Sequence, residues 1–338
     1  MHRDFFAAAL AALVVAVCAV PAVRAQGHPL PGLLLVDQKG DRSLALVDPA
    51  AGKVIANVAE NAVTGHEVAA SPDGRLAFVP IYGNSGVGRP GTDGRTIAVI
   101  DLATHKIVRN IEFDHGVRPH CAVLGPDGLL YVTTELDRSI TIIDPRTFRI
   151  VGAIPTGQPE SHMLAISRDG LRGYTANVGP GTVSVLDLKA RKTLAIIHVS
   201  GEIQRIAVSP DGQWVFTADQ TKPQLAVIDT ATNQVQTRVP LSGLGYGSAV
   251  TPDGRFLLIA VPAANHVDVV DLGTMKLARS IPVGLSPQEV LIAPGGKTAY
   301  VSCAGSNQVD QIDTSAWSVT GHIATGKGTD GLGWAAGD

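Results

Sequence analysis

Residues 206–239 read IAVSPDGQWVFTADQTKPQLAVIDTATNQVQTRV, and this stretch decides the fold. Its apolar and β-branched residues fall into four short runs, at 206–208, 214–218, 225–228 and 234–239. A Pro-Asp-Gly turn separates the first two runs, because Pro presets one turn dihedral and Gly accepts a positive φ. Short runs divided by turn residues every 8 to 12 or so positions are typical of β-strands. The stretch therefore predicts a unit of four antiparallel strands.

The same unit recurs along the chain. Pro-Asp-Gly, or a degenerate form of it, begins at positions 72, 126, 168, 210, 252 and 294, which are 42 residues apart except for 54 between the first two. An apolar residue followed by Asp keeps the same register seven times, ending at Asp48, Asp101, Asp144, Asp187, Asp229, Asp271 and Asp313. A four-stranded repeat of about 42 residues is typical of a propeller blade. We therefore predict an all-β, seven-bladed β-propeller.

The two ends of the chain predict how the ring closes. The first unit has strands at 33–36, 44–47 and 54–58, but it lacks the innermost strand. Residues 330–335, near the end of the chain, align with the innermost strand of the other units. We expect this C-terminal strand to complete the N-terminal blade, which leaves no free sheet edge at the seam.

Composition excludes several classes of protein. The 338 residues carry a formal net charge of -3, with 45% hydrophobic and 17% charged residues, so the chain is not a disordered polymer. Without a block of Lys or Arg, nucleic acid and anionic membranes are poor partners. Three scattered Cys are too few for a disulfide framework or a Cys-based zinc site. No CxxCH motif is present, which excludes covalent c-type haem.

The first 25 residues predict export. A short basic start is followed by an apolar run at 5–20, and Val23-Arg24-Ala25 resembles a signal peptidase site. The apolar run is too short to predict a membrane span, so we expect no transmembrane segment in the mature protein. Cleavage after Ala25 would leave residues 26–338 as a single propeller domain. We expect that domain to be periplasmic or secreted.

The second strand of several units carries a family motif: Tyr131-Val132-Thr133-Thr134, Tyr174-Thr175-Ala176-Asn177, Phe216-Thr217-Ala218-Asp219 and Tyr300-Val301-Ser302-Cys303. In these residues the chain resembles the YVTN family of propeller repeats. The resemblance covers nearly the whole mature chain and implies the propeller fold. It implies less about function, since that family includes many exported binding proteins of unassigned role. Related propellers include lactonase-like hydrolases and the propeller subunits of periplasmic redox enzymes, and a shared fold does not choose among them.

One column of the repeat predicts a functional site. The innermost strand of a blade lines the central channel, and function usually lies on loops that such a scaffold holds. Six positions before each Pro-Asp-Gly, in ring order, stand Asp330, His66, His120, His162, Gln204, Tyr246 and Gln288. Three imidazoles beside a carboxylate would suit zinc, copper, iron or manganese. Glu67 is a candidate ligand or general base in that case. Arg118 and Glu160 lie just outside this column, where they could orient an imidazole or hold a substrate.

The second unit is longer than the others, and the extra residues lie at about 83–95. They extend a loop that belongs on the same face as His66 and His120. Arg89 and Arg95 in this loop could meet an anionic ligand. The loop is rich in Gly, but it lacks the Lys-Ser/Thr ending and the following helix of a phosphate loop.

Two functions remain open on the sequence alone. In the first, an exported binding or interaction protein holds a small ligand or a protein partner at the polar mouth of the channel, without chemistry. In the second, a metal-dependent enzyme, either a lactonase-like hydrolase or a redox enzyme, uses the Asp/His/His/His arc. Polar residues at a channel mouth can also simply hold ordered water. We favour the binding protein, because no local nucleophile motif is present.

Overall fold

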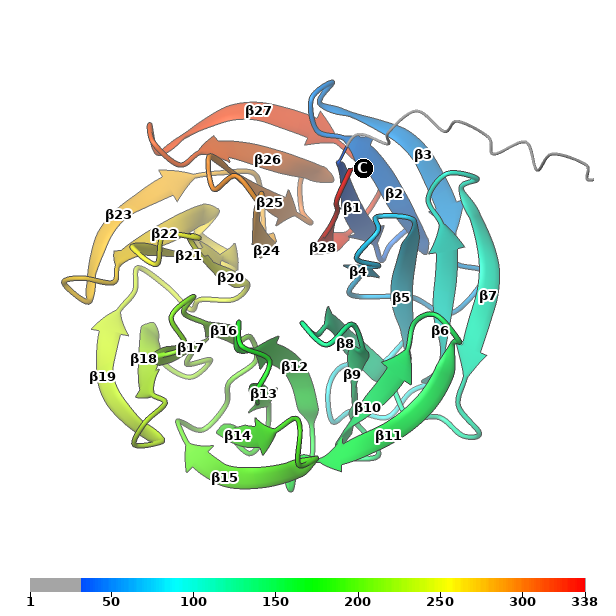
Figure 1. The fold of residues 1–338 in the computed structure, drawn as a ribbon. Helices are drawn as coiled ribbons and strands as arrows, with labels where there is room; N and C mark the ends of the chain where they lie inside the picture. Colours follow the sequence, from blue (N-terminus) through cyan, green and yellow to red (C-terminus); the bar gives the residue numbers. More distant parts are fainter. Residues whose placement is uncertain (1–31, 338) are drawn as a thin grey trace, which may run out of the picture.

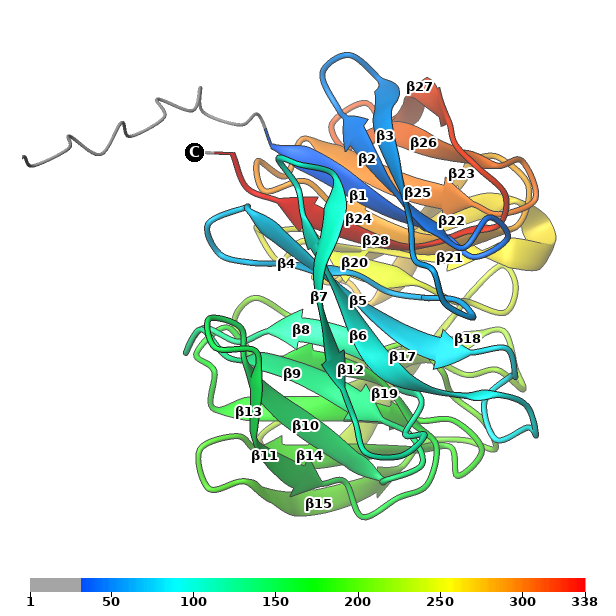
Figure 2. The same cartoon turned by 90° about the vertical axis from the view of Figure 1, so that its right-hand side faces the viewer.

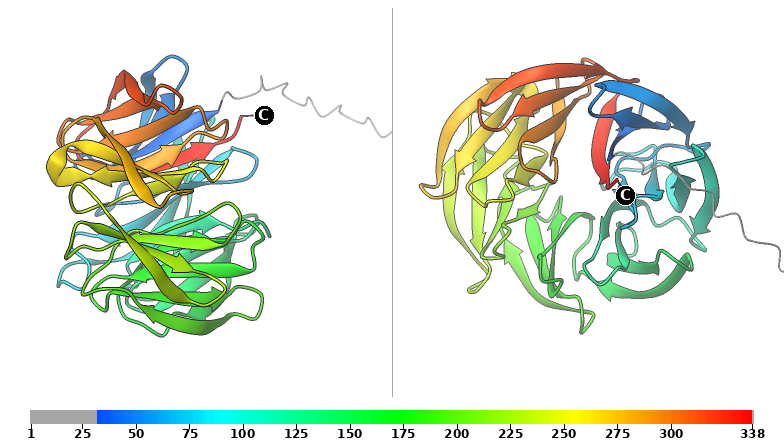
Figure 3. Two further views of the ribbon diagram at one scale, coloured as in Figure 1. Left: turned by 90° about the vertical axis from the view of Figure 1, so that its left-hand side faces the viewer. Right: turned by 45° about the horizontal axis from the view of Figure 1, so that its top comes forward.

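The computed structural model describes residues 32–337, so the predicted signal peptide at 1–25 lies outside the described residues. Seven four-stranded antiparallel sheets stand in a ring around a central axis (Figure 1), which confirms the predicted seven-bladed β-propeller. Figure 2 and the left panel of Figure 3 show the ring from two sides, and its right panel shows it tilted. Strand connections emerge at two opposite faces.

The four strands of each blade are lettered from A, the innermost, to D, the outermost. Blade 1 is β28 (Thr329–Ala335), β1 (Leu33–Gln38), β2 (Ser43–Asp48) and β3 (Lys53–Ala59). Blade 2 is β4 (Ala69–Ala70), β5 (Leu76–Gly83), β6 (Asp93–Asp101) and β7 (Lys106–Glu112). Blade 3 is β8 (Pro119–Leu124), β9 (Leu130–Thr134), β10 (Ser139–Asp144) and β11 (Arg149–Pro155). Blade 4 is β12 (Ser161–Ile166), β13 (Arg172–Asn177), β14 (Thr182–Asp187) and β15 (Lys192–His198).

The remaining blades follow the same order. Blade 5 is β16 (Ala207–Val208), β17 (Trp214–Ala218), β18 (Gln224–Asp229) and β19 (Gln234–Pro240). Blade 6 is β20 (Ser248–Val250), β21 (Phe256–Val261), β22 (His266–Asp271) and β23 (Lys276–Pro282), with the 3-10 helix η1 (Pro262–Ala264) between its middle strands. Blade 7 is β24 (Pro287–Ile292), β25 (Thr298–Cys303), β26 (Gln308–Asp313) and β27 (Ser318–Ala324).

Burial follows the position of a strand in its blade. The middle strands are covered on both faces by neighbouring blades, so most of their residues are buried; residues 44–47 of β2, for example, are fully buried. The outermost strands alternate between exposed and partly buried residues, as half-covered edge strands do. The Asp that ends each third strand accepts hydrogen bonds from the following turn. Asp48 Oδ1, for instance, accepts from the amides of Ala50 and Ala51, each at 2.9 Å.

The ring closes as the sequence predicts. β28 pairs antiparallel with β1, with Trp334 opposite Leu34 and Leu332 opposite Val36. The C-terminal strand thus becomes the innermost strand of the first blade (Figure 1). Through this pairing, backbone groups of β1 that would otherwise form an open sheet edge are satisfied.

The blades present two different faces. The D–A and B–C loops emerge at one face, which we call the mouth face, and the A–B and C–D turns emerge at the other. In blades 2 and 5 the innermost strands are only two residues long, so the chain entering them is loop held by single bridges, such as Gly65 to Ile81. Within residues 32–337, no helical segment has the length and hydropathy that crossing a bilayer requires.

Candidate functional site

The residues predicted for the channel mouth meet around a cavity of about 360 Å³. Every blade except blade 7 contributes to its lining. The lining residues are Lys39, Thr64, His66, Tyr82, residues 83–87, His120, His162, Gln204, Arg205, Tyr246 and Asp330. Six of these side chains come from the column that the repeat alignment singles out, namely His66, His120, His162, Gln204, Tyr246 and Asp330.

Three imidazoles and one phenol form the floor of this cavity. The rings of His120 and His162 lie 3.6 Å apart, centroid to centroid, and those of His66 and His120 lie 5.1 Å apart. The ring of Tyr82 is 4.9 Å from His66, 5.2 Å from His120 and 5.9 Å from His162. Tyr82 enters from β5, whereas His120 and His162 occupy equivalent positions at the start of β8 and β12. The ring geometry of the propeller therefore makes neighbours of residues about 40 positions apart in the sequence.

Burial keeps these imidazoles neutral. It lowers the pKa of His120 and His162 well below the ordinary value, with neighbouring cationic groups adding to the effect. The pKa of His66 falls to about 3, mainly through burial and then through the nearby Lys39. A neutral imidazole offers one hydrogen-bond donor and one lone pair, and the lone pair can also bind a metal ion.

The cavity also contains polar atoms that lack partners. The Nδ1 atoms of His120 and His162 and the Nε atom of Arg205 are buried without a hydrogen-bond partner among the described residues. Buried polar atoms are normally satisfied, so unsatisfied ones that line a cavity point to a ligand or to ordered water. No group of three or more His, Cys, Asp or Glu within residues 32–337 is arranged to hold a metal ion. A metal would therefore require the His side chains to rotate.

A buried guanidinium also lines the cavity. Arg205 is 2% exposed and donates to Glu67, to Glu289 at 2.8 Å and to Asp330 at 3.3 Å, which come from three other blades. Its charged group also lies 4.7 Å from the ring centroid of Tyr246. We call Arg205 and these three carboxyl groups the channel hub. The candidate base Glu67 is therefore an ion-pair partner in this structure.

The pKa values of the three hub carboxyl groups shift in different directions. Burial raises the pKa of Glu289 to about 8, although Arg205 opposes the shift. Burial likewise raises the pKa of Glu67 against the pull of Arg205. Burial acts on Asp330 in the same direction, but Lys39, at 3.1 Å, and Arg205 outweigh it, and the pKa of Asp330 is lowered. The pKa is therefore raised at Glu67 and Glu289 and lowered at Asp330, so Asp330 is the hub carboxyl group that most readily keeps its negative charge.

The extended loop of blade 2 forms one wall of the cavity, as its place in the repeat predicts. Arg118 fastens this loop: its guanidinium donates to Asp93 at 2.6 Å and to the Arg89 carbonyl at 2.8 Å. Glu135 accepts from the Gly88 amide at 3.1 Å and from the Tyr82 hydroxyl. The Glu135 carboxylate therefore positions both the extended loop and Tyr82, whose ring lies next to all three imidazoles.

Four other predicted residues lie outside the cavity lining. The Gln288 amide donates to the Ser286 carbonyl and hydroxyl, both at 3.0 Å. Arg95 pairs with Glu112 on the outermost strand, at 3.5 Å. Glu160 lies next to Gly88 of the loop and accepts a hydrogen bond from the Gly179 amide at 2.7 Å. Arg89, within the loop, is exposed.

The sequence prediction missed Tyr82, Lys39 and Glu135. Tyr82 lies at the end of a second strand rather than in the column that precedes the Pro-Asp-Gly turns. Lys39 and Glu135 belong to B–C turns, whose side-chain directions the repeat does not fix. Comparing the B–C turns blade by blade would have found both, because these turns share the mouth face.

The buried imidazoles predict a loss of stability in acid. Because the pKa of His120 and His162 is depressed on folding, their contribution is present above about pH 6.5 and is lost as pH falls. Each should cost about 2 kcal/mol of unfolding free energy by pH 5. Urea titrations from pH 7.5 to 5 should show a flatter pH dependence for the His120→Asn, His162→Asn double variant. A double variant as pH-sensitive as wild type would contradict this account.

Comparisons with known proteins agree with this architecture. The model of the cytochrome D1 heme domain family matches residues 124–251. The seven-bladed beta-propeller protein Rv1057 of Mycobacterium tuberculosis is 34% identical over 140 residues, which cover 41% of this chain and 31% of that protein. The chain is a seven-bladed β-propeller. The propeller fold expected from the resemblance to YVTN repeats is therefore confirmed.

Solved structures show the same propeller. Hydrazine synthase from Kuenenia stuttgartiensis superposes with a TM-score of 0.67 at 19% identity, covering 80% of this chain and 89% of that one. A functionally unknown protein from Desulfotomaculum acetoxidans gives 0.75 at 14% identity, covering 90% and 99%. At these identities the likeness concerns the fold alone. The match to the curated relative spans about a third of that relative's length.

The family match raises the question of a haem, and the mouth of this propeller does not fit one. A haem needs a flat slot with an axial ligand facing it. Here His120 and His162 pack against each other and against Tyr82, and the cavity of about 360 Å³ is at the small end of ligand pockets. The function proposed for this cavity therefore involves no haem.

Proposed function

We propose that the protein is an exported binding protein that holds a small polar ligand at the mouth of its channel. One observation carries the proposal: polar side chains from six blades converge on one cavity, and buried nitrogen atoms of three of them lack partners among the described residues. A stiff ring with a polar pocket at one mouth is suited to binding without chemistry. Export rests on the sequence of residues 1–25, and the mature chain would be residues 26–338.

The lining favours a ligand that accepts hydrogen bonds. Arg205 Nε–H is a donor in every protonation state, and Lys39 lies at the cavity with 40% of its side chain exposed. The neutral imidazoles add one donor and one acceptor each. Asp330, the carboxylate in the lining, already pairs with Lys39 and Arg205, so a ligand anion would meet cationic groups here rather than a free carboxylate. Carboxylates, amides and hydroxyl-bearing molecules are the classes to test first.

A metal-dependent enzyme is the second candidate, because neutral imidazoles with unpartnered nitrogens are suitable ligands for a transition metal. His66, His120 and His162 would hold the ion, with Asp330 beside them. Such a centre would polarise a carbonyl or activate water in a lactonase-like hydrolase, or support redox chemistry. Glu67 could act as a base only after leaving Arg205.

Thermal unfolding of the mature protein tests the binding proposal. A panel of amino acids, dicarboxylates and sugars, with chlorides of zinc, copper and manganese as separate arms, should contain a polar organic molecule that raises Tm. A ligand concentration about a hundredfold above Kd should stabilise the folded protein by about 2.7 kcal/mol, which raises Tm by roughly 5 °C. His120→Ala with His162→Ala should abolish the shift, and exposed His322→Ala should not.

The arms of this experiment separate the two candidates. A stoichiometric metal in the purified protein that disappears in the His66→Ala, His120→Ala double variant would favour the enzyme. A metal-free protein whose Tm ignores all three metals would count against it. A panel without any saturable organic ligand would contradict the binding proposal.

A further inference from the structure

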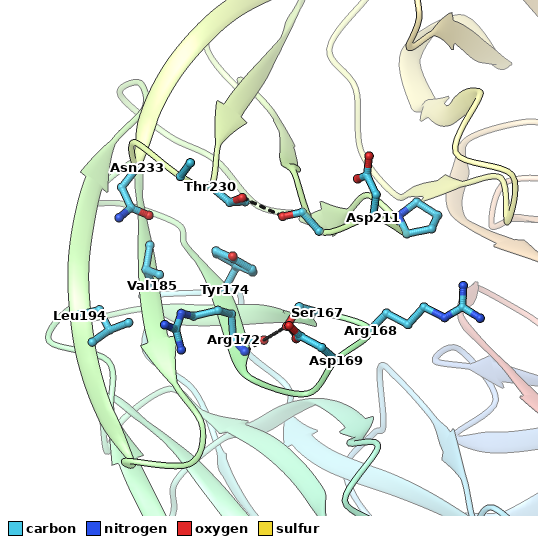
Figure 4. A pocket seen from close by; sticks show the side chains of 13 residues that line it. Ser167, Arg168, Asp169, Arg172, Tyr174, Val185, Leu194, Asp211, Thr230 and Asn233 are labelled. Carbon is cyan, nitrogen blue, oxygen red and sulfur yellow. Dashed lines mark hydrogen bonds between the residues drawn. The ribbon is translucent and has the colours of Figure 1, made fainter.

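The imidazoles of the mouth cavity are covered, although they belong to the candidate ligand site. His120 and His162 line the cavity but are only 1% and 3% exposed, and the Nδ1 atom of each is buried. The groove between blades 4 and 5, on the opposite face, is a contrast: Figure 4 shows Leu194 on its wall, and Leu194 is 42% exposed. A ligand reaches the imidazole nitrogens only after some covering group moves.

The extended loop of blade 2 lies where such a cover is needed. Residues 83–87 line the cavity together with the imidazoles. Beyond them, the tip of the loop is anchored on blade 3: the Gly88 amide donates to Glu135 at 3.1 Å, and Arg118 donates to the Arg89 carbonyl at 2.8 Å. The loop therefore leaves its own blade and crosses to the neighbouring one at the mouth.

Gly88 is the point at which the loop comes closest to blade 4. Its φ of 65° lies in the left-handed region that favours glycine. A Cβ at this position would lie 2.5 Å from Oε1 of Glu160, whose carboxylate also accepts from the Gly179 amide. A side chain at position 88 would therefore push the loop away from blade 4. Gly86 has no such constraint, since a Cβ there would meet only Arg89 Cγ, at 3.7 Å.

The closed position of the loop depends on few contacts. Its base is the Gly83 to Asp93 pair of β5 and β6, and each of residues 84–92 is exposed or partly exposed. Segments with little buried apolar surface open more readily than the sheets that carry them. In five other blades the same connection has only four residues, such as 135–138 in blade 3. The propeller therefore does not need the extra length to fold.

The loop also presents an unpaired polar group to the cavity. Ser85 lines it, and its hydroxyl is buried without a hydrogen-bond partner among the described residues. A buried hydroxyl is normally satisfied, so an unpaired one beside a cavity points to a ligand or to ordered water. The inner side of the loop is thus suited to contact what the cavity holds.

We propose that residues 84–92 form a lid, which closes the mouth cavity over its ligand and opens by releasing Gly88 and Arg89 from blades 3 and 4. The proposal rests on the proposed function, because the lid admits the mouth ligand. Opening uncovers the imidazoles while the base of the lid stays fixed at Gly83 and Asp93, so no blade has to unfold. Closure adds the Ser85 hydroxyl to the groups that contact the ligand.

Modification by diethyl pyrocarbonate tests the lid without a known ligand, because this reagent acylates neutral imidazole nitrogens. Mass spectrometry of the full mature chain gives separate rates for His120, His162 and the exposed His105, which lies on the opposite face. Gly88→Ala should raise the rates at His120 and His162 by about tenfold or more, because the added methyl group keeps the lid from closing. Gly86→Ala, the matched control in the same loop, should keep the wild-type rates. His105 should react equally in every protein.

A second variant removes the lid. Residues 84–92 are replaced by Asn-Gly, which favours a two-residue hairpin turn between Gly83 and Asp93. In this shortened protein both imidazoles should react at least as fast as in Gly88→Ala. Circular dichroism melts check that each variant folds.

Two results would overturn the proposal. If His120 and His162 react as slowly in the shortened protein as in wild type, the loop does not cover them. If the shortened protein reacts fast but Gly88→Ala keeps the wild-type rates, the loop is a fixed wall. Neither result depends on the mouth ligand, so failure of the lid is distinguished from failure of the binding proposal.

Discussion

Deleting residues 329–338, which removes β28, is expected to lower Tm by about 10 °C. The deletion opens the ring: it exposes the edge of β1 and removes Leu332, which is 7% exposed, from the core. Lost apolar burial of about 2 kcal/mol and several ladder hydrogen bonds of about 1 kcal/mol each amount to roughly 5 kcal/mol. For a domain of this size, at about 2 °C per kcal/mol, that corresponds to about 10 °C. Calorimetry of the mature protein measures it.

A shorter deletion supplies the matched control. Removing only residues 337–338, beyond β28, should leave Tm within about 1 °C. The long deletion also removes Asp330, so a full-length Asp330→Asn variant separates loss of that carboxylate from loss of the strand. A long deletion as stable as the parent would show that closure of the ring does not stabilise the fold.

Replacing Arg205 by Met is expected to destabilise the protein by about 3–5 kcal/mol, because the variant leaves buried carboxyl groups without their cation. Arg205 serves Glu67, Glu289 and Asp330 at once. Adding Glu67→Gln and Glu289→Gln should recover much of the loss, since removing all the charges is far less costly than stranding some of them. Denaturant unfolding measures each step, and Arg146→Met, at a site whose side chain is 90% exposed, should change Tm by about 1 °C or less.

The pH dependence of the Arg205 variant distinguishes this explanation from simple loss of packing. Burial raises the pKa of Glu67 and Glu289, and Arg205 is the group that opposes the shift. Carboxyl groups with a raised folded pKa stabilise the fold below their unfolded value, and the contribution is lost as pH rises through the folded value. The deficit of Arg205→Met should therefore be larger at pH 8.5 than at pH 5. A deficit that is constant with pH would indicate packing alone.

Much of the candidate site could be predicted because the repeat fixes which residues start the innermost strands. His66, His120 and His162 occupy one column, and a ring of equal units must place that column around the axis. Tyr82 and Glu135 escaped prediction because their roles depend on how the extended loop folds across neighbouring blades. Arg205 directly follows Gln204 of that column, but its pairing with three carboxyl groups depends on side-chain directions inside the channel. Arg95 was predicted to meet an anionic ligand, but in the structure it pairs with Glu112 on the outermost strand of its blade.

The sequence by itself determined the number of blades, the order of their strands and the closure by β28. These follow from turn chemistry and a 42-residue period, which act locally and are written into each unit. Only the tertiary structure decided that three imidazoles meet Tyr82 at one cavity, and that one arginine pairs with carboxyl groups from three other blades. Those features arise where side chains from different blades compete for the same buried space, and local sequence does not encode the outcome of that competition.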